Sequence, residues 1–202
     1  MKSSNTVNNL FLTGCFILFL SSCKQKVSSN WNDKFLLNEI TISEIQDGYE
    51  NRIYSVREIT TLYLDRIQKI DYSGPELNSL LITNPDALDI ADSLDQLIKI
   101  GKNTGALFGI PIVLKDNINT ADKMPTTGGS RVLKNSYPKK DSWVAKKIRT
   151  SGGIIIAKAN LSEWANYRAS FSSSGWSGVG GQTKNPYVLD RKLVSIHSQD
   201  RD

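Results

Sequence analysis

"SGGIIIAKAN", residues 151–160, carries the strongest indication of how this chain folds. Its centre, GIIIAKA (153–159), is a continuously apolar run of strand length, which is typical of a strand buried on both faces of a sheet. The residues before it, 141–151, have a helical pattern, and Gly152 can end that helix. We therefore predict a helix that leads directly into a buried strand.

Two further strands are expected upstream of this one. GIPIVLKD (109–116) and SLLIT (79–83) both have strand character. A helix is predicted between them, with Asn84 as its N-cap, Pro85 at its first position and Gly101 as its terminator. Strands that alternate with helices indicate an α/β domain with a largely parallel sheet.

Helix starts can be read from local motifs elsewhere in the chain. TISE (41–44) and SVRE (55–58) both match the capping box, in which a hydroxyl side chain is followed three residues later by a glutamate. After the second box, apolar residues recur at helical spacing and predict an amphipathic helix. Asn160 is expected to cap another helix, because an acid, Glu163, follows it three residues later.

The N-terminus has the pattern of an export signal. MKSSNTVNN carries Lys2 as its charged side chain and precedes the apolar run LFLTGCFILFL (10–20). A membrane-spanning helix needs roughly 18 or more apolar residues, so this run is too short to span. A basic start, a short apolar stretch and small residues after it are typical of a secretory signal.

A cysteine follows that signal directly. Leu20-Ser21-Ser22-Cys23 resembles the bacterial lipoprotein signal box, in which the cysteine becomes the new N-terminus and carries lipid. Each buried CH₂ contributes about 0.8 kcal/mol, so several acyl chains would hold the protein firmly on a membrane. The alternative is an ordinary cleaved signal with an incidental cysteine.

Composition excludes several classes of protein. The 25 basic and 20 acidic residues give a net charge of +5, with no basic stripe of the kind that binds nucleic acid. His197 is the only histidine, which excludes zinc sites built on several histidines and a Ser-His-Asp triad in the ordered part. Once the signal with Cys15 is removed, Cys23 is the remaining cysteine, which excludes a disulfide framework.

Lys115 is the first candidate for chemistry. It ends the apolar strand IPIVL, and the ends of strands in α/β sheets are common places for sites. A partly desolvated lysine there has a lowered pKa, and its neutral amine can act as a general base. The alternative is a lysine that simply reaches solvent.

Two glycine-rich segments leave their roles open. TTGGSR (126–131) is either an anion-binding nest or an ordinary turn. SFSSSGWSGVGG (170–181) has the composition of a flexible surface loop. Its serines, among them Ser172 to Ser177, cannot be distinguished by spacing, so the residues alone select no nucleophile.

Three segments together resemble the amidase signature family, and within it the peptide-amidase-like branch. They are DYSGPELNSLLITNPDAL (71–88), GIPIVLKDNINTADKMPTTGGS (109–130) and SGGIIIAKANLSEWANYRASFSSSGWSGVGGQTKNPY (151–187). The resemblance implies a mixed, largely parallel sheet surrounded by helices, and hydrolysis of carboxamides to an acid and ammonia or an amine. It implies no metal and no organic cofactor.

The resemblance also assigns a role to Lys115. The family uses a Ser-cisSer-Lys triad, and its lysine lies in an LKDN motif that matches Leu114 to Asn117. In such a triad the neutral lysine takes a proton from the nucleophilic serine through the intermediate serine. Backbone N–H groups near the nucleophile then hold the oxyanion.

The last residues, 192–202, depart from the family pattern. In the family, NPY leads into a glycine- and serine-rich stretch with the relay serine, and the nucleophile follows in a second glycine-containing turn. Here KLVSIHSQDRD follows Arg191, and neither Ser195 nor Ser198 is flanked by glycine. We therefore assign neither serine a role, and we expect strand edges such as that at Ile154–Ile156 to lack partners.

These patterns give one arrangement of the chain and three functional hypotheses. We expect a lipoprotein-type signal (1–22), a polar tether (23–40), the N-terminal portion of an amidase domain (41–191) and a non-family tail (192–202). The first hypothesis is an exported, lipid-anchored amidase-family chain that acts on amides or amidated peptides by resemblance, but is inactive alone. The others are half of a split amidase completed by a second chain, and a non-catalytic binding lipoprotein.

Overall fold

The computed structural model describes residues 38–103, 105–167 and 173–189, all within one unit of the chain, residues 32–202. The expected signal, most of the tether and the tail lie outside the described residues. So do Cys23, Ser172, Ser195, His197 and Ser198. Among the described residues, no helix is both long enough and apolar enough to cross a membrane.

The described helices begin close to where the local motifs predict them. They are α2 (Ile42–Glu50), α3 (Val56–Arg66), α4 (Ala87–Lys99), α5 (Trp143–Thr150), a π-helical turn η1 (Ile67–Tyr72) and the 3₁₀ helices η2 (Arg131–Leu133) and η3 (Glu163–Asn166). Both capping boxes are confirmed: the side chains of Thr41 and Ser55 accept hydrogen bonds from the backbone N–H groups of Glu44 and Glu58. Gly152, with φ +83°, follows α5 as expected.

The predicted strands form one mixed sheet. β1 (Leu80–Thr83), β3 (Ile154–Ala159) and β2 (Pro111–Lys115) lie in that order, with β3 in the middle. β2 runs parallel to β3, and β1 runs antiparallel to it. A short hairpin with two residues in each strand, β4 (Trp176–Ser177) and β5 (Gly181–Gln182), forms a separate sheet.

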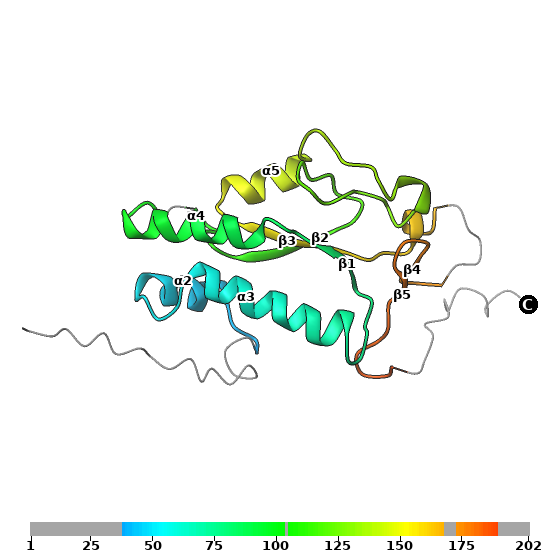
Figure 1. The fold of residues 1–202 in the computed structure, drawn as a ribbon, viewed down its shortest axis with the longest axis horizontal. Helices are drawn as coiled ribbons and strands as arrows, with labels where there is room; N and C mark the ends of the chain where they lie inside the picture. Colours follow the sequence, from blue (N-terminus) through cyan, green and yellow to red (C-terminus); the bar gives the residue numbers. More distant parts are fainter. Residues whose placement is uncertain (1–37, 104, 168–172, 190–202) are drawn as a thin grey trace, which may run out of the picture. The chain divides into compact units, whose positions relative to one another are not determined.

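Helices cover both faces of the sheet. Figure 1 shows α5 and α3 on opposite sides of it, and both α4 and α5 contact β3. The core on the α5 side consists of Leu114, Met124, Ala145 and Ile155, with Ile82, Ile112, Ile118 and Ile148 packed around it. The expected α/β class with a mixed sheet and surrounding helices is therefore confirmed.

One prediction about strand edges is wrong. Ile154–Ile156 was expected to present an unpaired edge, but β3 is hydrogen-bonded on both sides and its side chains there are buried. Within the three-stranded sheet of the described residues, the strands that lack a second partner are β1 and β2. The apolar run of β3 follows from this central position, because a middle strand covered by helices has no solvent-facing side.

Two asparagines predicted to be helix caps bind backbone groups of distant segments. α4 begins after Asp86 and not at Asn84, although Asn84 Oδ1 accepts from Asp86 N–H at 3.0 Å; the Asn84 side-chain N–H donates to the carbonyl oxygen of Ile155 at 2.8 Å and so extends the β1–β3 pairing. Asn160 starts no α-helix either, because the residues after it form only the short η3. An asparagine that can satisfy buried backbone groups of a strand is used there rather than at a helix end.

Candidate active site at the carboxyl end of the parallel strand pair

Lys115 is the last residue of β2, opposite Ala159, the last residue of β3. The carboxyl ends of parallel strands meet at one edge of a sheet, which is where sites in α/β folds gather. The Lys115 side chain is exposed, whereas partial desolvation was expected. Its ammonium has no hydrogen-bond or ion-pair partner among residues 38–103, 105–167 and 173–189.

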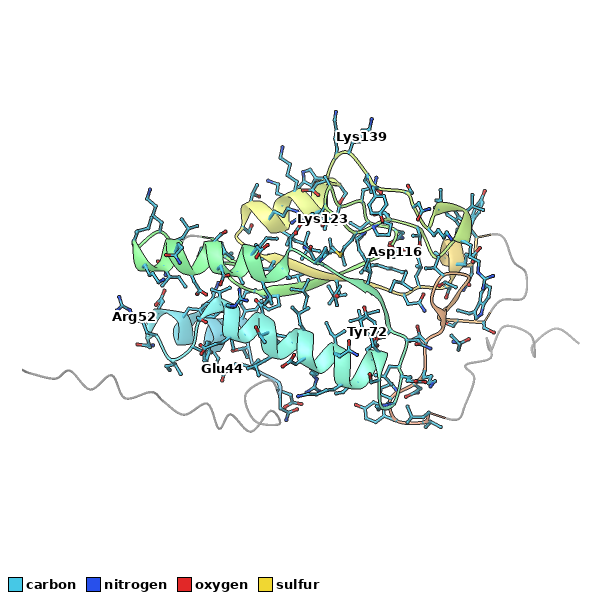
Figure 2. All side chains as sticks on the ribbon, viewed as in Figure 1. Glu44, Arg52, Tyr72, Asp116, Lys123 and Lys139 are labelled. Atoms are coloured by element: carbon cyan, nitrogen blue, oxygen red, sulfur yellow. The ribbon has the colours of Figure 1, made fainter. Side chains whose placement is uncertain are left out.

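Asp116 fixes the backbone directly after Lys115. Its N–H donates to the carbonyl of Ala159 at 3.1 Å, and its own carbonyl accepts from Gly128 N–H at 3.1 Å. Its carboxylate is 1% exposed and accepts hydrogen bonds from the backbone N–H and the hydroxyl of Thr127. Figure 2 shows Asp116 beyond the strands, among the loops that follow them. The turn after β2 is therefore tied to the TTGGSR segment.

Lys158 is a fully buried lysine in β3. Its Nζ donates to the carbonyl of Ile118 at 2.7 Å and to the hydroxyl of Thr126 at 2.8 Å, and lies 3.9 Å from the Asp116 carboxylate. Burial lowers the pKa of the Lys158 ammonium, while the carboxylates of Asp116 and Asp122 act in the opposite direction. Three oxygens thus surround the ammonium, which is the condition for burying such a charge.

The TTGGSR segment is a turn whose shape depends on glycine. Gly128 and Gly129 have φ values of +57° and +81°. A Cβ on Gly129 would lie 2.7 Å from the Cβ of Ser177, closer than atoms pack. The Gly129 N–H donates to the Thr127 hydroxyl at 2.9 Å, so the turn is held from the Asp116 side as well. Of the two interpretations left open, these bonds support an ordinary, tightly packed turn.

The segment after β3 packs against this turn in an unusual conformation. Trp164, Ala165 and Asn166 all have positive φ, between 51° and 64°, which non-glycine residues seldom adopt. Trp164 N–H donates to the Gly128 carbonyl at 2.9 Å, and its ring lies beside Gly128. Backbone strain of this kind persists only where surrounding contacts determine it.

The serine- and glycine-rich segment contributes one buried serine with a structural task. Ser177 is fully buried, donates its hydroxyl to Asn160 Oδ1 at 2.7 Å and accepts from Gly180 N–H at 2.9 Å. Asn160 Nδ2 lies 3.1 Å from the carbonyl oxygens of Asn78 and Gly181. Ser177 is thus saturated with partners and is no free nucleophile.

The arrangement gathers three segments around the end of the parallel pair. The turn at 126–130, the residues 160–166 and the hairpin at 175–183 are hydrogen-bonded to one another or to Asp116. An exposed primary amine, Lys115, stands at their edge. Chemically this offers a base or a cation on a rigid support. Among the described residues, no group of three or more histidine, cysteine or acidic side chains could hold a metal ion.

The sequence patterns did not reveal which residues contact the Asp116 carboxylate, among them Lys158. Lys158 lies inside the apolar run GIIIAKA, and the prediction of a buried strand there names no acceptors for its ammonium. A charged residue in a run buried on both faces must have buried acceptors. The signal that could have found the pair is therefore Lys158 itself, whose position requires an acid such as Asp116.

Comparison with known proteins places this arrangement in a family. The family model described as Amidase matches residues 58–194. A probable amidase of Arabidopsis thaliana is 39% identical over 184 residues, which cover 89% of this chain and 34% of that protein. A glutamyl-tRNA(Gln) amidotransferase subunit from Thermoanaerobacter pseudethanolicus is 37% identical over 156 residues, 77% of this chain and 30% of that protein.

The fold agrees with a solved relative. The structure of native peptide amidase from Stenotrophomonas maltophilia superposes with a TM-score of 0.73 at 40% identity, and covers 75% of this chain and 31% of that one. The chain therefore spans about a third of the length of the relatives it matches. The match over most of its residues shows that the chain belongs to the amidase family.

Proposed function

We propose that this chain is the lysine-bearing part of a hydrolase that cleaves the C–N bond of carboxamides, with Lys115 as the general base. The observation that carries the proposal is the position of Lys115: an exposed amine ends a parallel strand, next to a turn fixed by buried hydrogen bonds. A base must be held rigidly and still be reachable by the group it deprotonates.

The proposed reaction is acyl transfer through serine. The neutral amine of Lys115 accepts the proton of a nucleophilic serine through an intermediate serine, and the serine oxygen attacks the amide carbon. The leaving nitrogen takes a proton and departs as ammonia or an amine. Water then hydrolyses the acyl-enzyme through the same relay, which yields the acid. The two serines belong to the part of a family protein that this chain does not span.

We expect no amide turnover from residues 24–202 alone. A base without its nucleophile has no proton to remove, and Ser177, a fully buried serine packed against the turn, is hydrogen-bonded to Asn160 and Gly180. Ammonia release from amidated peptides and aliphatic amides measures this directly. Turnover above that of a Lys115→Ala control would contradict the expectation and would require a nucleophile among the serines of this chain.

The alternative of a split amidase rests on two findings. The chain covers about a third of its relatives, and one relative is named as a subunit of an amidotransferase. A second polypeptide with the two serines would then complete the site. Activity that appears only when such a polypeptide is added favours this alternative. A stable, monomeric chain that binds amides without turnover favours the binding lipoprotein.

We also propose that the protein is exported and anchored through lipid on Cys23. The support is the sequence Leu20-Ser21-Ser22-Cys23 after a short apolar run. Labelled fatty acid should enter the protein in a bacterial host, and Cys23→Ser should abolish the label. Cys15→Ser is the matched control, because that cysteine lies inside the apolar run and should not matter. Label that persists in Cys23→Ser would defeat the assignment.

The role of Lys115 is tested in an extended chain, in which the remaining length of a family amidase follows Arg191. Lys115→Ala should reduce kcat by orders of magnitude with little loss of stability, because it removes a base and no packing contact. Lys139→Ala is the matched control, since Lys139 is an exposed lysine that projects from the loop before α5 (Figure 2). Undiminished hydrolysis by Lys115→Ala would make Lys115 a structural residue.

A further inference from the structure

We propose that Lys158 is a positioning residue for Lys115, acting through Asp116, within the hydrolase proposed above. Lys158 touches neither Lys115 nor the exposed edge of the sheet. Its ammonium is instead buried behind the turn from which Lys115 projects.

The ammonium of Lys158 joins three separate places in the turn region. Its acceptors are the Ile118 carbonyl, two residues beyond Asp116, and the Thr126 hydroxyl, at the start of the glycine turn. The Asp116 carboxylate lies 3.9 Å away as its counter-ion. One cation therefore ties both ends of the loop 116–126 to the central strand.

Asp116 transmits this restraint to Lys115. Both backbone polar groups of Asp116 are hydrogen-bonded, to Ala159 and to Gly128, and its carboxylate holds Thr127. The carbonyl of Lys115 itself accepts from Ile118 N–H at 3.0 Å. The backbone of Lys115 is thus fixed by residues that Lys158 fixes, and a shift of Asp116 would move the lysine and the glycine turn together.

The strand register explains why Lys158 acts from behind. Leu114 is the Cα partner of Lys158, and Lys115 is the partner of Ala159. Because successive side chains of a strand point to opposite faces, Lys115 lies on the opposite face from Leu114 and Lys158. The two lysines are therefore near neighbours along the strands, but only one faces the exposed side.

Core packing alone does not require an ion pair at this place. Desolvation opposes the charged form and lowers the pKa of Lys158, and an apolar side chain of similar volume in place of a buried ion pair is often neutral or stabilising. What an apolar side chain cannot do is bind two oxygens and a carboxylate in one fixed geometry. The cation is therefore matched to the orientation of the turn rather than to core packing.

The first experiment uses the extended chain and separates kcat from KM. Lys158→Met should lower kcat about 100-fold with KM little changed, because misplacement of a catalytic group by about 1 Å costs that much. Thr126→Val removes one acceptor of the ammonium while leaving the charge, and should lower kcat less, in the same direction. It serves as the second variant if Lys158→Met does not fold.

The matched control is Asp71→Asn. Asp71 is also a buried carboxylate, bonded to Ser79 and to Leu80 N–H at the start of β1, which lies across β3 from β2. Its loss should lower stability but leave kcat of the folded protein unchanged. An unchanged kcat in folded Lys158→Met or Thr126→Val, alongside an inactive Lys115→Ala, would overturn the positioning role and leave the proposed function standing.

The second experiment does not depend on turnover. In the 202-residue chain, competitive acylation of lysines is measured by mass spectrometry, with Lys139 as an internal reference. Lys158→Met should change the rate at Lys115 relative to Lys139, because the turn that holds the Lys115 backbone loses the cation that binds Ile118 and Thr126. An unchanged ratio of Lys115 to Lys139 would overturn the inference even if the chain proves not to be a hydrolase.

Discussion

Lys115 and Lys158 lie at the ends of two neighbouring strands and have opposite surroundings. Lys115 ends the edge strand β2, is exposed and has no partner among the described residues, whereas Lys158 lies in the central strand β3, fully buried, with two hydrogen-bond acceptors and a carboxylate 3.9 Å from its ammonium. Both follow apolar runs in the sequence. The surroundings of a lysine in this sheet are therefore set by the place of its strand, more than by the hydrophobicity of that strand.

The largest expected effect is on stability, and it separates the two lysines. Lys158→Met should lower the free energy of unfolding by about 3–5 kcal/mol, because it leaves the buried Asp116 carboxylate without its counter-ion. Lys115→Met should change it by less than about 0.5 kcal/mol, as surface substitutions do. Urea denaturation of both variants gives the two values. Similar losses would mean that the exposed lysine is also part of the folded network.

The glycine turn behind Lys115 should be the next most sensitive place. Gly129→Ala combines a φ of +81° with a Cβ that meets Ser177 at 2.7 Å, and should cost about 1–3 kcal/mol. Gly101→Ala, at φ +69° with open space around it, carries the backbone strain alone and is the control. Thermal melts of the pair compare them. Equal shifts in Tm would show that the turn can open to admit the methyl group.

Alkaline pH offers a third comparison. The pKa of Lys158 is lowered in the folded protein, so between that pKa and 10.5 the unfolded chain binds more protons, and stability rises with pH in this window. Lys158→Met should lack that rise. Subtracting the free energies of unfolding of the two proteins, measured in denaturant from about pH 8 to 10, cancels the contribution of titratable groups that both contain. Among these is Tyr72, whose pKa burial raises to about 12. Parallel curves would mean that Lys158 is protonated alike in both states.

The smallest effect is expected on the outer side of β2. Val113 is 40% exposed on this strand, and Val113→Thr should change the free energy of unfolding by no more than about 0.5 kcal/mol. Ile155→Thr in β3 buries a hydroxyl in the core beside Leu114 and should cost several times more. A large loss at Val113, measured in the same denaturation series, would indicate that this edge is covered in solution.

Local motifs predicted the elements but not their neighbours. The capping boxes at Thr41 and Ser55 and the strands around 79–83, 109–116 and 153–159 are confirmed because each depends on nearby residues. The order of strands depends on contacts between distant residues, so β3 was expected to carry a free edge and is in fact central.

The same limit applies to the site. Lys115 could be singled out from the end of its strand, while its catalytic role, which the family resemblance suggested, is a proposal. The acceptors of Lys158 lie 32 and 40 residues away in sequence, so no local pattern joins them. Asn84 and Asn160 were expected to cap helices for the same reason: a local motif was visible, and the distant backbone carbonyls that bind their side chains were not.

The hydrogen bonds to the Asn78 carbonyl limit the order in which the growing chain can form its contacts. The hydroxyl of Thr183 donates to the Asn78 carbonyl across 105 residues, and Asn160 reaches the same oxygen across 82. At roughly 5–20 residues per second, synthesis needs about 5–20 s to bring Thr183 to its partner. The hydrogen bonds just before β1 therefore cannot be complete until the hairpin at 175–183 has been synthesised. The helices of the first hundred residues, which depend on nearer contacts, can form while that interval is still running.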